Sequence, residues 1–161
     1  MSEKEKVAVL GLGYVGLPLA LLSAEKGYET VGIDLDISKI DAINQGKSPF
    51  VDEEVEETLK DTSLKATTEA DFIEEADIIL ICVPTPLKNG IDPDLGPLEG
   101  AAKAVAQNMK PGALVIVEST INPGICEDVV LPILVQTTGL SEDQVLLAHC
   151  PERINPGDPN F

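Results

Sequence analysis

Three glycines near the N-terminus constrain the fold more than any other feature of this sequence. Gly11, Gly13 and Gly16 have the spacing Gly-x-Gly-x-x-Gly, between a short aliphatic run at residues 6–10 and a helix-like segment at residues 14–26. In such a motif the first glycine allows a tight turn, the second lets the backbone approach a pyrophosphate, and the third lets the helix pack close to the strand. The motif in this setting predicts a dinucleotide-binding unit with phosphates at the helix N-terminus.

The next strand-like run, residues 30–33, ends at Asp34. A carboxylate in this place accepts hydrogen bonds from ribose hydroxyls and repels a 2′-phosphate, so it favours NAD over NADP. The alternative is that Asp34 is only a turn residue. Asp36 is expected to serve a turn or a helix cap. Lys39 either reaches back toward the ribose or lies on a solvated helix surface.

Strand-like and helix-like segments alternate along the rest of the chain. Further strands are expected at residues 64–67, 77–83, 113–118 and 145–150. Further helices are expected at residues 38–45 with Ser38 as the N-cap, 53–60, 98–109 and 124–137 with a bend at Pro132. Residues 85–96 are rich in Pro, Gly and Asn and are expected to form a loop. This alternation predicts one α/β domain over residues 1–161, a doubly wound Rossmann fold with a mainly parallel sheet of about six strands.

The composition supports an aliphatic core and excludes some partners. Hydrophobic residues make up 43% of the chain and aromatic residues only 3%, which suits buried parallel strands. A formal charge of −17 argues against nucleic acid or an anionic membrane surface as a partner. The acidic stretches at 52–61 and 69–77 are interpreted as solvated helix faces. No signal peptide or transmembrane segment is expected.

The cysteines and the single histidine do not indicate a metal or a catalytic centre. Cys82, Cys126 and Cys150 are widely spaced and form no Cys-x-x-Cys pair, so neither a zinc site nor a disulfide framework is expected. Reduced thiols in a cytoplasmic protein are the simplest interpretation. Cys82 is expected in the core, and His149 is expected to be a structural residue of the last strand.

Two more strand ends carry polar residues that are candidates for ligand binding. Val83, Pro84 and Thr85 end one run, and Ser119 and Thr120 follow another. Ligands of open parallel sheets bind beyond the carboxyl ends of the strands. The alternatives are that the proline merely stops its strand and that the hydroxyl residues cap a turn. Glu118, at the same rim, fits a surface position or a salt bridge equally well.

Five ordered motifs give the chain a family resemblance. GLGYVGLPLA at 11–20, GIDLD at 32–36, VPTP at 83–86, ESTINPG at 118–124 and CPERINPGD at 150–158 occur in the order and spacing of the UDP-glucose/GDP-mannose dehydrogenase family. The resemblance covers essentially the whole chain. The form of the last motif is closer to the bacterial members that act on UDP-N-acetylhexosamines than to UDP-glucose dehydrogenases.

The resemblance implies an oxidoreductase that converts the C6 alcohol of a nucleotide sugar to a carboxylate with two NAD⁺. In this family an aldehyde forms first, and a cysteine in a GxCxxKD-like context captures it. That motif does not occur here, so none of the three cysteines is cast as the nucleophile. Thr120 resembles the family threonine near the nicotinamide that holds a catalytic water. Glu152 resembles the glutamate assigned to acid–base work beside the reacting carbon.

The resemblance also assigns binding roles. Arg153 would bind the substrate together with Glu152, and Pro156 stands where UDP-glucose dehydrogenases often carry a second glutamate. Tyr14 would pack near the pyrophosphate or the helix start. The expected cofactor-binding residues are Gly11, Gly13, Tyr14, Val15, Gly16, Asp34, Lys39, Val83, Pro84, Thr85, Ser119 and Thr120.

Family enzymes are much longer than this chain, and they continue with a dimerisation helix and a UDP-binding domain. The chain is therefore expected to be part of a homodimeric enzyme with a UDP-sugar substrate, to bind NAD weakly by itself and to turn over nothing. Two alternatives remain. One is another Rossmann dehydrogenase of the hydroxyacid or 6-phosphogluconate type, and the other is a non-catalytic NAD-sensing module.

Overall fold

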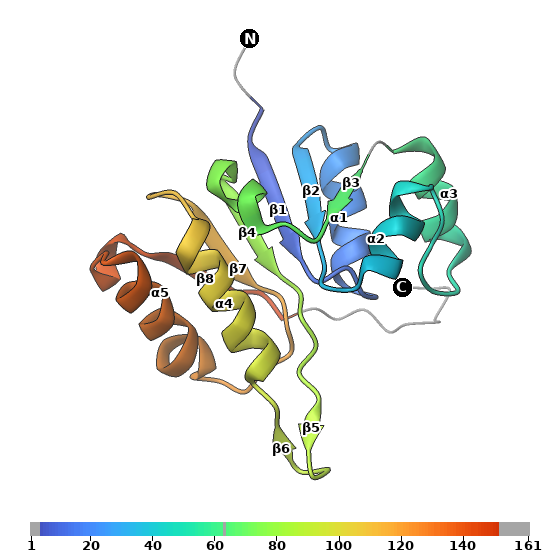
Figure 1. Cartoon of the computed structure of the whole chain (residues 1–161). Coiled ribbons are helices and arrows are strands. Elements are labelled where there is room, and N and C mark those ends of the chain that lie inside the picture. The colour runs from blue at the N-terminus through green and yellow to red at the C-terminus, as the bar shows by residue number, and fades with distance from the viewer. Residues whose placement is uncertain (1–3, 63, 152–161) are drawn as a thin grey trace.

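The computed structural model describes residues 4–62 and 64–151. Within these residues six parallel strands form one sheet in the order β3-β2-β1-β4-β7-β8 (Figure 1). The strands are β1 (Lys6–Leu10), β2 (Glu29–Ile33), β3 (Lys65–Thr67), β4 (Ile78–Ile81), β7 (Leu114–Val117) and β8 (Leu146–His149). The predicted α/β Rossmann fold, with a mainly parallel sheet of about six strands, is confirmed.

Helices cover both faces of the sheet. The helical segments are α1 (Gly16–Glu25), α2 (Ile37–Asn44), α3 (Glu53–Asp61), η1 (Ala70–Glu75), α4 (Gly96–Asn108), η2 (Cys126–Val130), α5 (Leu131–Thr138) and η3 (Glu142–Gln144). One face packs against α1, α2 and α3, and the other packs against η1, α4, η2 and α5. The chain therefore buries two apolar cores, one on each side of the sheet.

The central strands β1 and β4 are apolar on both faces because both faces are covered. In β1, Val7 and Val9 join the core under α1, whereas Ala8 and Leu10 join the core under α4. The central strand β4 divides its residues between the two cores in the same way. Continuous aliphatic strands of this kind are typical of parallel sheets between two helical layers.

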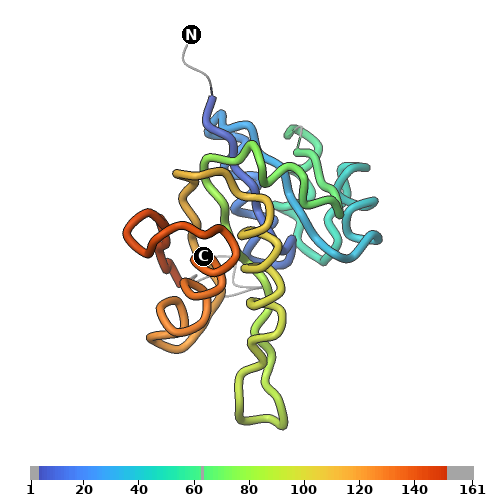
Figure 2. The backbone as a smooth tube through the Cα atoms, turned by 60° about the vertical axis from the view of Figure 1, so that its left-hand side comes forward, coloured from blue at the N-terminus to red at the C-terminus, as the bar shows by residue number. Residues whose placement is uncertain are grey.

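The segment predicted as a loop at residues 85–96 contains a small hairpin, which corrects that prediction. Strands β5 (Leu87–Lys88) and β6 (Asp92–Pro93) pair antiparallel and extend away from the body in both views (Figures 1 and 2). Asn89 and Gly90 have φ angles of 52° and 75°, which suit the central residues of a type I′ turn. The Asn-Gly pair was the sequence signal for this hairpin.

Two helix predictions also need correction. The N-cap of α2 is Asp36 and not Ser38, because the Asp36 carboxylate accepts a hydrogen bond from the Ser38 N–H at 2.9 Å. The helix expected at residues 124–137 begins with a π-helical turn, η2, and continues as α5 from Leu131 to Thr138. Pro132 lies in the first turn of α5, directly after the π-helical turn.

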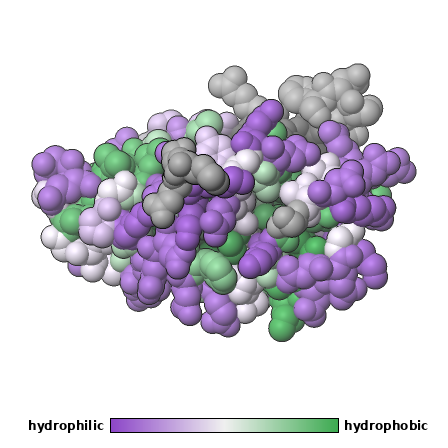
Figure 3. Space-filling model, turned by 90° about the horizontal axis from the view of Figure 1, so that it is seen from above, coloured by the Kyte–Doolittle hydropathy of each residue, from purple (hydrophilic) through white to green (hydrophobic). Residues whose placement is uncertain are grey.

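The two acidic stretches lie on the surface, as expected, the first on α3 and the second around the 3₁₀ helix η1. Figure 3 shows mostly hydrophilic side chains on the face seen from above, with smaller hydrophobic areas between them. No helix among the described residues is both long and apolar enough to span a membrane.

Candidate functional site

A crevice of about 340 Å³ lies at the carboxyl ends of the central strands. Strands β1 and β4 are neighbours, and the chain leaves β1 toward β2 on one side and leaves β4 toward β7 on the other. Such a point, where the strand order reverses, is where open α/β sheets bind their ligands. The crevice is lined by Gly11, Gly13, Tyr14, Val15, Asp34, Lys39, Cys82, Val83, Pro84, Thr85, Glu118, Ser119 and Thr120.

The crevice brings together almost every cofactor-binding residue expected from the sequence. Eleven of the twelve expected residues line it, and Gly16, the twelfth, is buried at the start of α1 beneath the loop. Glu152 and Arg153, expected to act on the substrate, lie outside the described residues. The sequence signals on four separate strand ends therefore converge on one surface.

The glycine loop is shaped by two close backbone approaches. Gly11 has φ +92°, and a Cβ there would lie 2.6 Å from the carbonyl oxygen of Cys82. A Cβ on Gly16 would lie 1.8 Å from the carbonyl oxygen of Gly11. In contrast, a Cβ on Gly13 would meet nothing within 4 Å. Two glycines are thus needed by the fold, and the third, which lines the crevice, has open space at its side-chain position, as a loop that receives a phosphate group requires.

Asp34 is tied to the glycine loop as well as facing the crevice. Its Oδ2 accepts a hydrogen bond from the Leu12 N–H at 2.8 Å, and its Oδ1 accepts one from the Asp36 N–H at 2.9 Å. Lys39 Nζ lies 3.1 Å from Oδ2. A carboxylate has about four acceptor positions, so Asp34 keeps capacity for a ribose hydroxyl while it holds the loop.

Asp34 stays ionised although its side chain is only 10% exposed. Burial raises its pKa, but the hydrogen bonds from the Asp36 and Leu12 N–H groups, together with Lys39, outweigh burial and hold the pKa below the ordinary value. Lys39 thus points back toward Asp34, which was one of the two positions left open for it. The ion pair places opposite charges side by side at the position expected for the ribose.

Hydroxyl groups link the two rims of the crevice, which are residues 82–85 after β4 and residues 118–120 after β7. The buried Ser119 hydroxyl donates to the Val83 carbonyl oxygen at 2.7 Å. The Thr85 hydroxyl donates to the Thr120 carbonyl oxygen at 2.8 Å. These bonds hold the two strand ends side by side, so Ser119 and Thr85 build the rim in addition to lining the crevice. The Thr120 backbone serves in this link, and its exposed side chain remains at the crevice.

Glu118 does not occupy a surface position, which was one of its two alternatives. It is 8% exposed, and it lines the crevice beside Ser119. The surface interpretation is therefore wrong. The motif that carries Ser119 and Thr120 also contains Glu118, and its place directly after a buried strand was the signal for a rim position.

Two other contacts of the glycine loop had no signal in the motif itself. The Leu12 side chain is fully buried and rests on β2, where a Cβ on Gly32 would lie 2.7 Å from it. The Tyr14 ring packs against Phe50 with ring centroids 4.3 Å apart. Gly32 inside a strand hints at close approach. Nothing in the sequence pattern pointed to Phe50.

The three cysteines and His149 differ in burial, because Cys150 and His149 are exposed whereas the other two cysteines are not. Cys82 and Cys126 are buried in the two cores, and burial raises the pKa of the Cys126 thiol. The predicted strand at residues 77–83 placed Cys82 inside the strand. In the structure β4 ends at Ile81, and Cys82 directly follows it. His149 is the last residue of the edge strand β8.

The fold and this crevice define the class: a dinucleotide-binding α/β protein of the Rossmann type. The chain belongs to the UDP-glucose/GDP-mannose dehydrogenase family, because the model of the family's NAD binding domain matches residues 5–161. The family resemblance is confirmed. NAD as the expected cofactor is confirmed at the level of this family domain.

Several relatives agree with this assignment. UDP-N-acetyl-D-mannosamine dehydrogenase of Pyrococcus horikoshii is 43% identical over 157 residues, which are 94% of this chain and 37% of the relative. UDP-N-acetyl-D-glucosamine 6-dehydrogenase of Salmonella typhi is 38% identical, over 97% of this chain and 37% of the relative. The chain thus spans well under half of the curated relatives it matches.

Solved structures of the family superpose closely on this fold. The structure of the Pyrococcus horikoshii dehydrogenase gives a TM-score of 0.88 over 94% of this chain and 37% of that chain. A ternary complex of GDP-mannose dehydrogenase from Pseudomonas aeruginosa gives 0.87 at 33% identity, over 92% of this chain and 36% of that chain. The family assignment replaces the alternative of a hydroxyacid dehydrogenase.

Proposed function

We propose that this chain is the cofactor-binding part of an NAD-dependent nucleotide-sugar 6-dehydrogenase. The whole enzyme would oxidise the C6 alcohol of a UDP-N-acetylhexosamine, or of UDP-glucose, to a carboxylate with two NAD⁺. The observation that carries this proposal is the crevice at the β1–β4 reversal, where the glycine loop, Asp34 and the linked rims meet. The relatives support the choice of a UDP-N-acetylhexosamine, because two of them act on such sugars by name.

The residues present fit an NAD molecule along the crevice. Open space over Gly13 and the start of α1 suits the pyrophosphate, and Asp34 suits the adenosine ribose. Bound NAD⁺ would supply a hydride acceptor. We assign the rim residues Val83, Pro84, Thr85 and Ser119 to the walls that position the cofactor.

Thr120 is proposed as a catalytic residue at the nicotinamide end. It follows β7 at the rim, its backbone is held by Thr85, and its side chain is exposed to the crevice. A hydroxyl there can orient a water molecule by hydrogen bonding. Glu152 and Arg153 complete the proposal as acid–base and substrate-binding residues, on the strength of the family motif.

The whole enzyme is proposed to be a homodimer that uses a UDP-sugar in the cytoplasm. The cysteine pattern supports this compartment, since all three cysteines are free thiols. Oxidation would need the parts that longer family members carry and that this chain does not match. This chain alone is therefore expected to bind NAD⁺ without producing NADH.

The test replaces the matching segment of the Pyrococcus horikoshii enzyme by this chain. The chimera is expected to reduce NAD⁺ with UDP-N-acetylmannosamine, and a Thr120→Val chimera is expected to lose at least about tenfold in kcat. Calorimetry on the chain alone measures NAD⁺ binding. A folded chimera that binds NAD⁺ but oxidises no UDP-sugar would support the alternative of an NAD-sensing module instead.

A further inference from the structure

The Tyr14–Phe50 contact joins the glycine loop to a distant turn of the chain. The two ring planes are tilted by 32°, with centroids 4.3 Å apart. Tyr14 lines the crevice, whereas Phe50 lines a neighbouring hollow of about 520 Å³ that ends at α3. The pair of rings thus lies between the crevice and this hollow.

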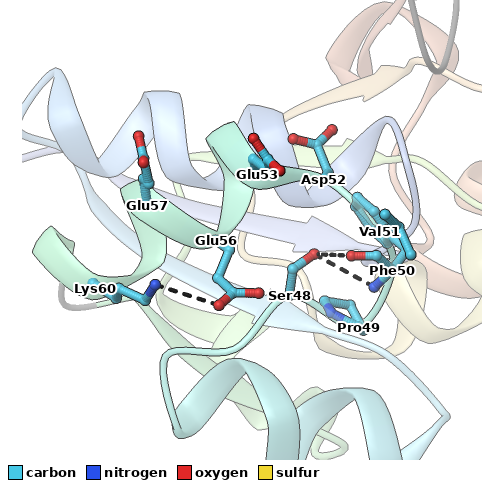
Figure 4. Close-up of a pocket in the computed structure, with 9 residues that line it drawn as sticks. All are labelled: Ser48, Pro49, Phe50, Val51, Asp52, Glu53, Glu56, Glu57 and Lys60. Carbon is cyan, nitrogen blue, oxygen red and sulfur yellow. Dashed lines mark hydrogen bonds and ion pairs between the residues drawn. The ribbon is translucent and has the colours of Figure 1, made fainter.

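Phe50 is held in place by its own turn. The Ser48 hydroxyl donates to the Phe50 carbonyl oxygen at 2.6 Å, and the Phe50 N–H lies 3.4 Å from the same hydroxyl oxygen (Figure 4). Two residues later Asp52 caps α3, accepting the Val55 N–H at 3.0 Å. The ring therefore stands on a turn whose backbone is fixed at both ends.

Helix α3 anchors that turn to the glycine loop's own helix. Val55 and Leu59 of α3 are buried in the same core as Leu17 of α1. The turn and the loop are consequently attached to one packed body. Phe50 is therefore held in place where the Tyr14 ring rests on it.

Tyr14 lies next to the loop glycine whose side-chain position is open. It follows Gly13, where a Cβ would meet nothing within 4 Å although the Gly13 carbonyl oxygen accepts the Leu17 N–H at 3.1 Å, and it precedes Val15, the N-cap of α1. Glycine-rich backbone loses much conformational freedom when it is ordered, and this loss weakens ligand binding unless the loop is ordered beforehand. A ring anchored on Phe50 restrains the backbone between Gly13 and Val15.

We propose that Phe50 is a positioning residue for the dinucleotide: through Tyr14 it preorders the glycine loop that receives the pyrophosphate. The inference rests on the proposed function, because it assumes that NAD occupies the crevice. Phe50 touches no cofactor in this role and acts only through the Tyr14 ring.

The test is a double-mutant cycle on NAD⁺ affinity. Phe50→Ala and Tyr14→Ala are each expected to weaken NAD⁺ binding about three- to tenfold, from the usual strength of an aromatic pair. The double variant is expected to bind no more weakly than either single variant, because both remove one contact. Phe50→Tyr keeps a ring and should restore binding. Val51→Ala, next to it and fully exposed, is the matched control and should bind as the wild type does.

A second measurement separates positioning from a general loss of structure. Phe50→Ala should weaken the binding of ADP-ribose, which carries the pyrophosphate, and leave the affinity for adenosine unchanged. Both affinities are measured by titrations followed on the amide NMR signals. Equal losses for both ligands, additive losses in the cycle, or wild-type affinity in folded Phe50→Ala would each overturn the inference and leave the proposed function intact. A wild-type chain that binds no NAD⁺ would overturn the proposed function and this inference together.

Discussion

The three glycines of the loop between β1 and α1 differ in what a side chain would meet. At Gly16 the obstacle is a backbone oxygen that cannot move without deforming the loop, and at Gly13 there is none. The same residue type is therefore required by the fold at Gly16 but not at Gly13. This difference can be tested, because an alanine at Gly16 should reduce stability, whereas an alanine at Gly13 should reduce NAD⁺ affinity.

Gly13→Ala is expected to change the free energy of unfolding by less than about 1 kcal/mol and to weaken NAD⁺ binding at least about tenfold, because the methyl group fills the phosphate space. Gly16→Ala is expected to cost about 3 kcal/mol or more of stability, because of the overlap with Gly11. Urea unfolding and calorimetry measure both quantities. Loss of stability in Gly13→Ala would show that the open space is not available to a methyl group.

Asp34 and Lys39 carry opposite charges side by side at the expected ribose position. Asp34→Asn removes the carboxylate and leaves the Lys39 ammonium without its partner. We expect NAD⁺ affinity to fall about tenfold, from the usual value of a hydrogen bond to a charged group, and the preference for NAD⁺ over NADP⁺ to shrink. The affinities for both nucleotides, measured by calorimetry, give this ratio.

Asp36→Asn is the matched control for that variant. It removes one carboxylate two residues away and keeps an N-cap for α2, since Asn caps helices as well as Asp does. Its NAD⁺ to NADP⁺ ratio should equal that of the wild type. A ratio unchanged in Asp34→Asn would mean that the crevice carboxylate does not face the ribose.

At the scale of elements, the outer strand β3 depends on a side chain of α2. The Asn44 amide donates to the Ala66 carbonyl oxygen at 2.9 Å and accepts the Ala66 N–H at 3.0 Å. These two bonds supply β3 with the pairing that an edge strand lacks on its open side. The short strand of three residues is thereby clamped between β2 and α2.

Asn44→Ala is expected to reduce the free energy of unfolding by about 1 to 3 kcal/mol, because two backbone groups lose their partner. Hydrogen exchange of the Ala66 amide should speed up more than exchange of β1 amides. Asn108→Ala, which removes a single amide bond to a helix carbonyl, serves as the comparison and should have a smaller effect. Equal exchange at Ala66 in wild type and variant would contradict the clamp.

The hydroxyl groups at the ends of β4 and β7 have different roles at the site. The carboxyl ends of β4 and β7 are joined by Ser119 and Thr85, so the crevice wall is built by hydroxyls that the motif alone suggested for the ligand. Strand ends in a parallel sheet must meet at one edge, and this made their convergence predictable. Which hydroxyl bonds to protein and which remains at the crevice depends on distances that the strand pattern does not contain.

At the scale of the whole molecule, an excess of carboxylates governs the response to pH. Hydrogen bonds from lysine side chains hold the pKa values of Asp77, Glu75 and Asp94 below their ordinary values. The pKa values of Asp34 and Asp36 are also lowered, by hydrogen bonds from backbone and side-chain donors. Two of these groups, Glu75 and Asp77, precede β4 at its amino end, where Lys110 Nζ lies 2.6 Å from the Asp77 carboxylate. Each of them is more easily ionised in the folded chain than in the unfolded chain.

Stability is therefore expected to fall in acid. These carboxylates stabilise the folded chain at pH values above their unfolded pKa, near 3.8 for Asp and 4.5 for Glu, and the gain is lost as pH drops through the lower folded values. Below that range 11 Lys and Arg residues also leave a net positive charge. Urea midpoints followed by circular dichroism between pH 7 and pH 2 measure the effect. A midpoint at pH 2 as high as at pH 7 would contradict it.

The sequence by itself determined the fold class, the glycine loop and the strand ends that form the crevice. These features follow from local rules: glycine spacing, the acid after the second strand, and the geometry of parallel strands between two helical layers. The hairpin at Asn89 and Gly90 was not predicted, because the proline and glycine content of residues 85–96 indicates a loop just as well.

Only the tertiary structure decided which side chains meet across the chain. The bond from Leu12 to Asp34, the burial of Glu118 and the stacking of Tyr14 on Phe50 depend on how separate segments pack. Side-chain contacts of this kind have no period or motif in the sequence, since they are set by the shapes and distances of elements that are far apart along it. The glycine loop was therefore predictable from its residues, whereas the contacts that hold it were not.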